Sequence, residues 1–275
     1  MHTYNLHLVS DSTGETVNTI ARACIVQFEG VEVEEHIWPM VRTKKQLEDI
    51  CAEIEAEPGL VMFTLLDGAL RNQLQSFCRG VRIPCISVLD PFIAAFGSYL
   101  GVESRGLPGR QHAMDSEYFD RIDAMNFVMH HDDGQAVGNL KEAQVILVGV
   151  SRTSKTPTCV YLANRGIKAA NVPIVPNAPL PEALTNAKHA LVVGLTEDPV
   201  RLVQVRRNRL RMSQDEPDTE YTSLESVKAE VAAARRLFNK HGWPVIDVTR
   251  RSIEETAAAV LQLLAQRDRE LEAGE

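Results

Sequence analysis

Short apolar segments alternate with helical patterns along most of this chain, and that alternation constrains its fold more than any other feature. Between residues 15 and 28, apolar side chains recur at intervals of three and four and share one helix face: Val17, Ile20, Ala21, Cys24 and Phe28. Segments such as 4–9 and 60–66 are instead short apolar runs, typical of buried strands. Because strands joined through helices return in parallel, we expect an α/β fold with a parallel sheet.

The same alternation continues to the C-terminus with one interruption. In the first half, strands are predicted at 4–9, 31–41, 60–66 and 81–89, and helices at 15–28, 43–57, 69–79 and 91–100. Residues 101–116 then place four glycines or prolines among polar side chains, as domain junctions do. In the second half, strands are predicted at 144–150, 171–175, 190–195 and 244–248, with helices at 117–129, 156–164 and 224–239, from Pro199, and through Leu264. Two α/β domains are the simplest account.

Residues 144–164 predict a strand, a turn and a helix, and the turn has the composition of a phosphate-binding loop (P-loop). Such a loop points backbone N–H groups at a phosphate, beside the positive end of the following helix. Lys155 would neutralise phosphate charge, and the hydroxyl of Thr156 would coordinate Mg²⁺. The predicted nucleotide-binding residues are Gly149, Val150, Ser151, Arg152, Thr153, Ser154, Lys155 and Thr156.

One position departs from the usual G-x-x-x-x-G-K-[ST] pattern, because Ser154 replaces its second glycine. That replacement carries a conformational cost if the position needs a positive φ. The alternative is an ordinary strand-to-helix turn rich in small polar residues. Ser151 and Arg152 favour the loop, since both side chains can donate to phosphate. On this basis we expect residues 1–105 to form an N-terminal parallel α/β domain and residues 106–275 a P-loop kinase-like α/β domain.

A second polar segment, Ser10 to Thr16, follows the first predicted strand, at the strand end where open α/β sheets place ligands. Ser12 and Glu15 also have the spacing of a helix capping box, which needs no ligand to explain it. Both interpretations stay open.

Histidines and carboxylates gather just ahead of the loop, in the sequence His130-His131-Asp132-Asp133-Gly134. A carboxylate beside a histidine could act as a general base toward a hydroxyl, or bind Mg²⁺. His131, Asp132 and Asp133 are therefore candidate catalytic residues together with Lys155. The alternative is a polar turn, for which Asp-Asp-Gly is common chemistry.

Arginines also cluster on the predicted helix after Pro199, at positions 201, 206, 207, 209 and 211. They could hold phosphates or an acidic partner, with Arg201 and Arg206 as the best candidates. A solvated helix face is the ordinary alternative.

Composition excludes several classes of function. The net charge of −8 argues against nucleic-acid or anionic-membrane binding, which needs clustered cations. The sequence predicts neither a membrane span nor a signal peptide, so we expect a cytoplasmic protein. The five cysteines lack any C-x-x-C pair, so we expect core residues rather than disulfides or zinc ligands, and any Mg²⁺ would arrive with nucleotide.

Four segments together resemble one protein family: HLVSDSTGET, HHDDGQ, GVSRTSKTPTCVYLANRGIKAANVPIVP and GLTEDPVRLVQVRRNR. The chain resembles the bacterial pyruvate, phosphate dikinase regulatory proteins and the related phosphoenolpyruvate synthase regulators, from about Tyr4 to Leu264. The family's nucleotide-binding assignment corresponds to Gly149 to Thr156 here. Ser154, with Thr153 beside it, favours the dikinase branch, since the synthase branch is expected to have a glycine before the lysine.

The resemblance implies a bifunctional enzyme that acts on pyruvate, phosphate dikinase as its protein substrate. As a serine/threonine kinase, the enzyme would transfer a phosphate group from ADP to a regulatory threonine of the dikinase. As a phosphorylase, it would use inorganic phosphate to remove that group from the threonine and would release pyrophosphate. A homodimer is also implied. Three alternatives remain: the same activities on phosphoenolpyruvate synthase, a P-loop kinase for a small molecule, and a nucleotide sensor without catalysis.

Overall fold

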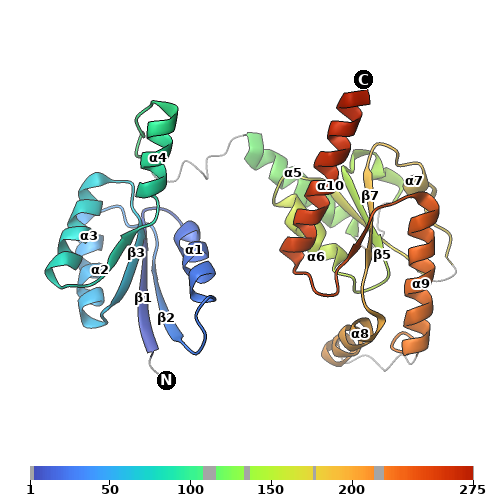
Figure 1. Ribbon diagram of the computed structural model, residues 1–275, viewed down its shortest axis with the longest axis horizontal. Coiled ribbons are helices and arrows are strands. Elements are labelled where there is room, and N and C mark those ends of the chain that lie inside the picture. The colour runs from blue at the N-terminus through green and yellow to red at the C-terminus, as the bar shows by residue number, and fades with distance from the viewer. Residues whose placement is uncertain (1–2, 108–115, 133–136, 176–177, 214–219, 275) are drawn as a thin grey trace. The chain divides into compact units, whose positions relative to one another are not determined.

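The protein consists of two compact units, Met1–Ala113 and Met114–Glu275, and each contains one four-stranded sheet (Figure 1). Every strand pair in both sheets is parallel, so the predicted α/β class is confirmed. The computed structural model describes residues 3–107, 116–132, 137–175, 178–213 and 220–274.

In unit 1 the strand order is β2-β1-β3-β4. The chain adds β2 on one side of β1 and then β3 and β4 on the other, so the strand order reverses between β1 and β3. Its strands are β1 (Thr3–Ser10), β2 (Glu32–Trp38), β3 (Gly59–Thr64) and β4 (Cys85–Ser87). Its helices are α1 (Glu15–Ile25), α2 (Lys44–Ala56), α3 (Gly68–Gly80) and α4 (Asp90–Leu100). Helices α2 and α3 pack on one face of this sheet and α1 packs on the other.

Local sequence explains α2 well and α1 less well. A capping box between Thr43 and Gln46 begins α2, whose predicted inner residues are all buried. Helix α1 ends at Ile25, three residues earlier than predicted, and buries only Val17 and Ala21. Phe28 is 67% exposed, so its predicted place in the core was wrong. The chain has already left the helix there, in a turn completed by Gly30 at φ 73°.

In unit 2 the strand order is β6-β5-β7-β8, the same arrangement as in unit 1. Its strands are β5 (Val145–Gly149), β6 (Ala169–Pro173), β7 (Leu191–Thr196) and β8 (Val245–Asp247). Its α-helices are α5 (Ser116–His130), α6 (Lys155–Ala163), α7 (Glu182–Thr185), α8 (Pro199–Ser213), α9 (Leu224–His241) and α10 (Ile253–Gly274), and a 3-10 helix covers Val137–Glu142.

Two hydrophobic clusters cover the two faces of the second sheet. Side chains of α5, α6 and α10 pack on the face that includes Val145 and Leu147. Side chains of α8 and α9 pack on the face that includes Ile146 and Val148. All five residues of β5 are buried, because helices cover both sides of this central strand. The strand therefore holds the loop that follows it in a fixed position.

Two further predictions can be compared with the structure. Within the described ranges, none of the helices has the length and apolar character needed to span a bilayer. All five cysteines are free thiols, and Cys51, Cys78 and Cys159 are buried as predicted. Cys24 is exposed on α1, so its prediction as a core residue was wrong.

Candidate functional site

The predicted P-loop follows β5 at the point where unit 2 reverses direction across its sheet. Strand β5 lies between β6 and β7, because the chain adds β6 on one side of β5 and then β7 on the other. In open α/β sheets, ligands bind at the carboxyl ends of the strands beside such a reversal. The sheet thus places the segment from Gly149 to Thr156 where a ligand is expected.

Gly149 ends the strand at a position that has no room for a side chain. A Cβ atom there would lie 2.6 Å from the carbonyl oxygen of Leu195 and 2.9 Å from Oγ1 of Thr153. The first contact is with the backbone of the neighbouring strand β7, which cannot move without breaking the pairing. The glycine is therefore required by packing.

The loop itself contains two residues in left-handed conformations, Arg152 at φ 73° and Ser154 at φ 58°. Ser154 is the N-terminal cap residue of α6, and its side chain makes no capping hydrogen bond. For a residue with a Cβ this conformation costs about 1–2 kcal/mol. The position does need a positive φ, so serine is strained where the common motif has glycine, and such strain is typical of functional sites.

Two loop side chains donate to the same carbonyl oxygen, that of Val150. The hydroxyl of Thr153 lies 3.0 Å from it, and Nζ of Lys155 lies 2.9 Å from it. Lys155 is the first residue of α6 and is only 5% exposed. Burying a cation is costly unless polar groups surround it. The carbonyl oxygen of Val150 supplies such a group and holds the ammonium within the loop.

Thr156 belongs to a polar cluster that joins three elements. Its hydroxyl donates to Oδ1 of Asp132 at 2.8 Å. Nδ2 of Asn171, on β6, donates to the same carboxylate oxygen at 2.8 Å and to Oγ1 of Thr156 at 2.9 Å. The structure thus brings Asp132 beside the loop, as its position in the sequence suggested. Asn171 was not foreseen, although a lone amide in the apolar strand AANVP was a signal.

The other residues of the histidine and carboxylate segment lie differently. The ring of His131 is buried, stacks on Phe127 at 3.9 Å between centroids, and lies 2.8 Å from the Phe127 carbonyl oxygen through Nδ1. His130 is exposed, and its Nδ1 lies 2.7 Å from the carbonyl oxygen of Asn126. Asp133 and Gly134 lie outside the described residues.

Cys159, one turn into α6, is buried near both Asp132 and Lys155. Burial raises the pKa of this thiol, the charge of Asp132 raises it further, and Lys155 lowers it. The thiol is therefore neutral, and Cys159 is a packing residue of the helix that carries the loop.

Arg206 supports the loop from α8. Its side chain is fully buried and forms two hydrogen bonds with the carboxylate of Glu230 on α9, at 2.7 and 3.2 Å. It also donates to the carbonyl oxygens of Tyr221 at 3.0 Å and Ser151 at 3.4 Å. Oγ of Ser151 lies 3.0 Å from the Tyr221 hydroxyl. Arg206 is thus neither solvated nor aimed at a ligand, and it holds the outside of the loop.

Two carboxylates at the end of β7 were not considered as site residues from the sequence. Glu197 is 5% exposed and forms an ion pair with Arg201 at 3.1 Å. Burial raises the pKa of Glu197, while the charge of Arg201 lowers it. Asp198 accepts from the backbone N–H groups of Val200 and Arg201 and so caps α8. Their signal was the pair of acids directly after an apolar strand.

In unit 1 the segment from Ser10 to Thr16 occupies the corresponding place after β1. Asp11 is buried, accepts from the Leu66 N–H at 2.6 Å, and has a pKa raised by burial. Gly14, at φ 82°, is the cap residue of α1 and no side chain caps the helix, so the predicted capping box of Ser12 and Glu15 is wrong. The cavity here measures about 30 Å³, room for little more than a water molecule.

Comparison with known proteins agrees with this arrangement. The model of the kinase/pyrophosphorylase family matches residues 6–261. Together with the parallel α/β fold and the loop at the reversal of the sheet, the match defines an α/β phosphotransferase. The chain belongs to the kinase/pyrophosphorylase family.

Curated relatives are similar to this chain over nearly its whole length. A protein of Paramagnetospirillum magneticum is 57% identical over 96% of this chain and 85% of its own. One of Sphingopyxis alaskensis is 54% identical over 97% and 99%, and one of a Chelativorans species is 55% identical over 94% and 96%. Each bears the name "Putative pyruvate, phosphate dikinase regulatory protein".

Proposed function

We propose that this protein is an ADP-dependent serine/threonine kinase and a phosphate-dependent, pyrophosphate-forming phosphorylase that acts on a regulatory threonine of pyruvate, phosphate dikinase. Phosphorylation would inactivate the dikinase and phosphorolysis would restore it. The family's description supports the two chemical activities, and the names of the relatives support the target. We also propose that the protein works in the cytoplasm, as a homodimer.

The observation that carries the proposal is the geometry of the loop at the head of α6. Successive backbone groups from Gly149 to Ser154 turn through two left-handed residues into the positive end of a helix. The ammonium of Lys155 already lies within this loop, against a carbonyl oxygen. A phosphate oxygen would replace that carbonyl as its partner, and the exchange brings opposite charges together.

In the kinase direction, the threonine oxygen of the target would attack the β-phosphorus of ADP. The bond between that phosphorus and the bridging oxygen breaks, AMP leaves, and the hydroxyl proton passes to a carboxylate, for which Asp132 and Asp133 are the candidates. Lys155 and the loop N–H groups stabilise the charge on the transferred group. Hydrogen bonds from Thr156 and Asn171 fix the orientation of Asp132.

In the phosphorylase direction, an oxygen of inorganic phosphate would attack the phosphorus of phosphothreonine. The bond to the threonine oxygen breaks, pyrophosphate forms, and the same carboxyl group returns the proton to the threonine oxygen. One site then serves both directions. The buried ring of His131, which lies against Phe127, has a structural place in this scheme rather than a proton-transfer role.

The donor set beside Lys155 suits Mg²⁺. A hydroxyl oxygen of Thr156 and a carboxylate oxygen of Asp132 lie 2.8 Å apart, and Mg²⁺ prefers such hard oxygen ligands. These two residues would hold the ion together with the nucleotide phosphates. When bound, Mg²⁺ supplies charge neutralisation on the phosphates.

The test is a two-stage assay with purified dikinase. Labelled ADP should produce phosphothreonine on the dikinase, and later addition of phosphate should release labelled pyrophosphate. Lys155→Ala should abolish both stages, whereas Lys141→Ala, which removes an exposed lysine of the same unit, should leave them unchanged. Transfer from ATP but not ADP would overturn the donor assignment. Transfer to a small acceptor without dikinase would overturn the protein substrate.

The carboxylates are tested by two conservative variants. Asp132→Asn and Asp133→Asn keep the size of the side chain and remove its basicity. Loss of both directions in one of them identifies the carboxylate that transfer requires, and full activity in both would remove carboxylate catalysis from the mechanism.

A further inference from the structure

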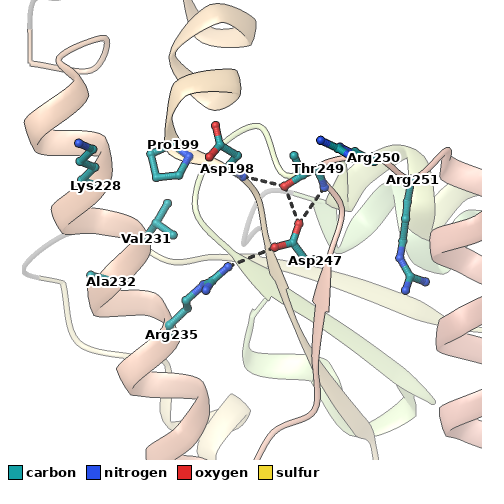
Figure 2. Close-up of a pocket in the computed structure, with 10 residues that line it drawn as sticks. All are labelled: Asp198, Pro199, Lys228, Val231, Ala232, Arg235, Asp247, Thr249, Arg250 and Arg251. Carbon is teal, nitrogen blue, oxygen red and sulfur yellow. Dashed lines mark hydrogen bonds and ion pairs between the residues drawn. The ribbon is translucent and has the colours of Figure 1, made fainter.

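A cavity opens at the edge of the unit 2 sheet where the loop lies, beyond β7 and β8. Its volume is about 670 Å³, within the range of small-molecule sites. Figure 2 shows that its residues come from three places: the start of α8 with the residue before it, one side of α9, and the end of β8 with the turn that follows. The lining residues are Asp198, Pro199, Lys228, Val231, Ala232, Arg235, Asp247, Thr249, Arg250 and Arg251.

The cavity lies within reach of the nucleotide loop. Strand β5, which leads into the loop, pairs with β7, and β7 pairs with β8. Neighbouring strands are about 4.8 Å apart, so the ends of β5 and β8 are separated by about 10 Å along the edge. A nucleoside diphosphate with its terminal phosphate in the loop can extend over that separation.

Part of the cavity floor is a closed network. Nη2 of Arg235 contacts Oδ2 of Asp247 at 3.2 Å, and Nε of Arg235 donates to Thr196 at 3.1 Å. The backbone N–H and hydroxyl of Thr249 both donate to Oδ1 of Asp247, while Thr249 accepts from the Asp198 N–H. These partners satisfy the carboxylate of Asp247. Burial raises the pKa of Asp247, but the hydrogen bonds from Thr249 and the charges of Arg235 and Arg251 lower it by more, so the pKa is lowered overall. The network links α9 to β7 and β8, and links the turn after β8 to the residue before α8.

Other side chains around the opening have no such partner in the described part of the chain. Lys228, Arg250 and Arg251 are exposed and make no ion pair there. Asp198 uses Oδ1 to cap α8, and no described group donates to its Oδ2. The cavity therefore offers two planar cations, an ammonium and a carboxylate oxygen. In a chain of net charge −8, this local cationic excess stands out.

These groups match a nucleoside better than a simple anion. Guanidinium planes stack on aromatic rings, and carboxylates accept hydrogen bonds from ribose hydroxyls. Val231, Ala232 and Pro199 supply apolar wall surface for a base. A carboxylate among the cations weakens their attraction for a bare phosphate, and Asp198 is drawn between Lys228 and Arg250 in Figure 2.

We propose that this cavity holds the nucleoside part of the diphosphate whose phosphates bind to the loop from Gly149 to Thr156. Arg250 and Arg251 stack on the base, and Oδ2 of Asp198 accepts from a ribose hydroxyl. This inference rests on the proposed function in one respect, because it takes the loop as the phosphate site.

The experiment separates the two sites by comparing ADP with pyrophosphate, which has the phosphates and no nucleoside. Binding of each is measured by calorimetry to the full chain, with Mg²⁺ present. The double variant Arg250→Ala/Arg251→Ala should weaken ADP about tenfold and leave pyrophosphate unchanged. Asp198→Asn, which still caps α8, should discriminate less well between ADP and its 2′,3′-dideoxy analogue than the unmodified protein does.

The control variant is Arg236→Ala/Lys240→Ala, which removes the same charge from exposed positions of α9 outside the cavity. It should leave both affinities unchanged. Equal weakening of ADP and pyrophosphate by the Arg250 and Arg251 double variant would overturn the nucleoside site, and so would unchanged ADP affinity. The proposed function fails separately, if the unmodified protein does not bind ADP or if Lys155→Ala binds it normally.

Discussion

The close contact of Gly149 with strand β7 predicts a large effect from one added methyl group. In Gly149→Ala the new Cβ would lie 2.6 Å from the backbone oxygen of Leu195 and 2.9 Å from Oγ1 of Thr153. Overpacking of this kind costs about 1–3 kcal/mol, and displacing Thr153 from the Val150 carbonyl adds about 1 kcal/mol. We expect unit 2 to lose about 2–4 kcal/mol of unfolding free energy.

The two tryptophans make the assay specific to one unit, because Trp38 lies in unit 1 and Trp243 in unit 2. In a Trp38→Phe background, fluorescence during urea unfolding reports on Trp243, which packs against the core of unit 2. Gly80→Ala is the matched control, since a Cβ there meets no atom within 4 Å. Measured by Trp38 fluorescence in a Trp243→Phe background, it should be neutral or slightly stabilising. A loss below about 0.5 kcal/mol in Gly149→Ala would refute a rigid contact between the loop and β7.

Three further predictions concern the surroundings of the loop. Arg206→Met should destabilise unit 2 by about 3–5 kcal/mol in the same unfolding assay, because Glu230 would lose its buried partner. The control is Arg207→Met, at an exposed neighbouring position, which should change the unfolding free energy little. Asn171→Ala should lower transfer from ADP about 10–100-fold with a smaller change in ADP affinity, as expected of a residue that positions Asp132; equal losses in rate and affinity would contradict this role. The raised pKa of Glu197 stabilises the folded state fully below its ordinary value of 4.5, and this contribution is lost as pH rises through the folded pKa. The unfolding free energy of the unmodified protein should therefore fall relative to Glu197→Gln as pH rises above 4.5, and parallel pH curves would contradict the assignment.

The two units have the same sheet topology, although their sequences show little sign of it. Both sheets have the same strand order, and in both the first strand leads through a polar loop into a helix capped by a left-handed residue, Gly14 or Ser154. The next residue is Glu15 in unit 1 and Lys155 in unit 2. A carboxylate at this position repels phosphate, whereas the ammonium attracts it. The loop of unit 1 also contains Asp11, whereas that of unit 2 contains Arg152, and both differences in charge favour the proposed phosphate site in unit 2.

The sequence predicted correctly those elements whose formation depends on interactions between residues a few positions apart. The capping box at Thr43 and the apolar stripe of α2 lie where the sequence indicated, because both are set by spacing within one helix. The strand over 169–173 was displaced by two residues in the prediction, since Ala169 and Ala170 have low strand propensity. Pairing of these alanines with Val145 and Ile146, and burial between helices, decide their conformation.

By itself, the sequence determined the α/β class and the strand-loop-helix segment with Lys155 and Thr156, because both follow from periodicity and from residue order along a few turns of chain. Only the tertiary structure decided which distant groups meet that segment. Asn171 donates to both Asp132 and Thr156, and Arg206, paired with Glu230, donates to the carbonyl oxygen of Ser151 in the loop, across separations of 15 to 55 residues. Such contacts depend on the order of strands in the sheet and on which helix covers each face. Those are properties of packing, and no local pattern in the chain encodes them.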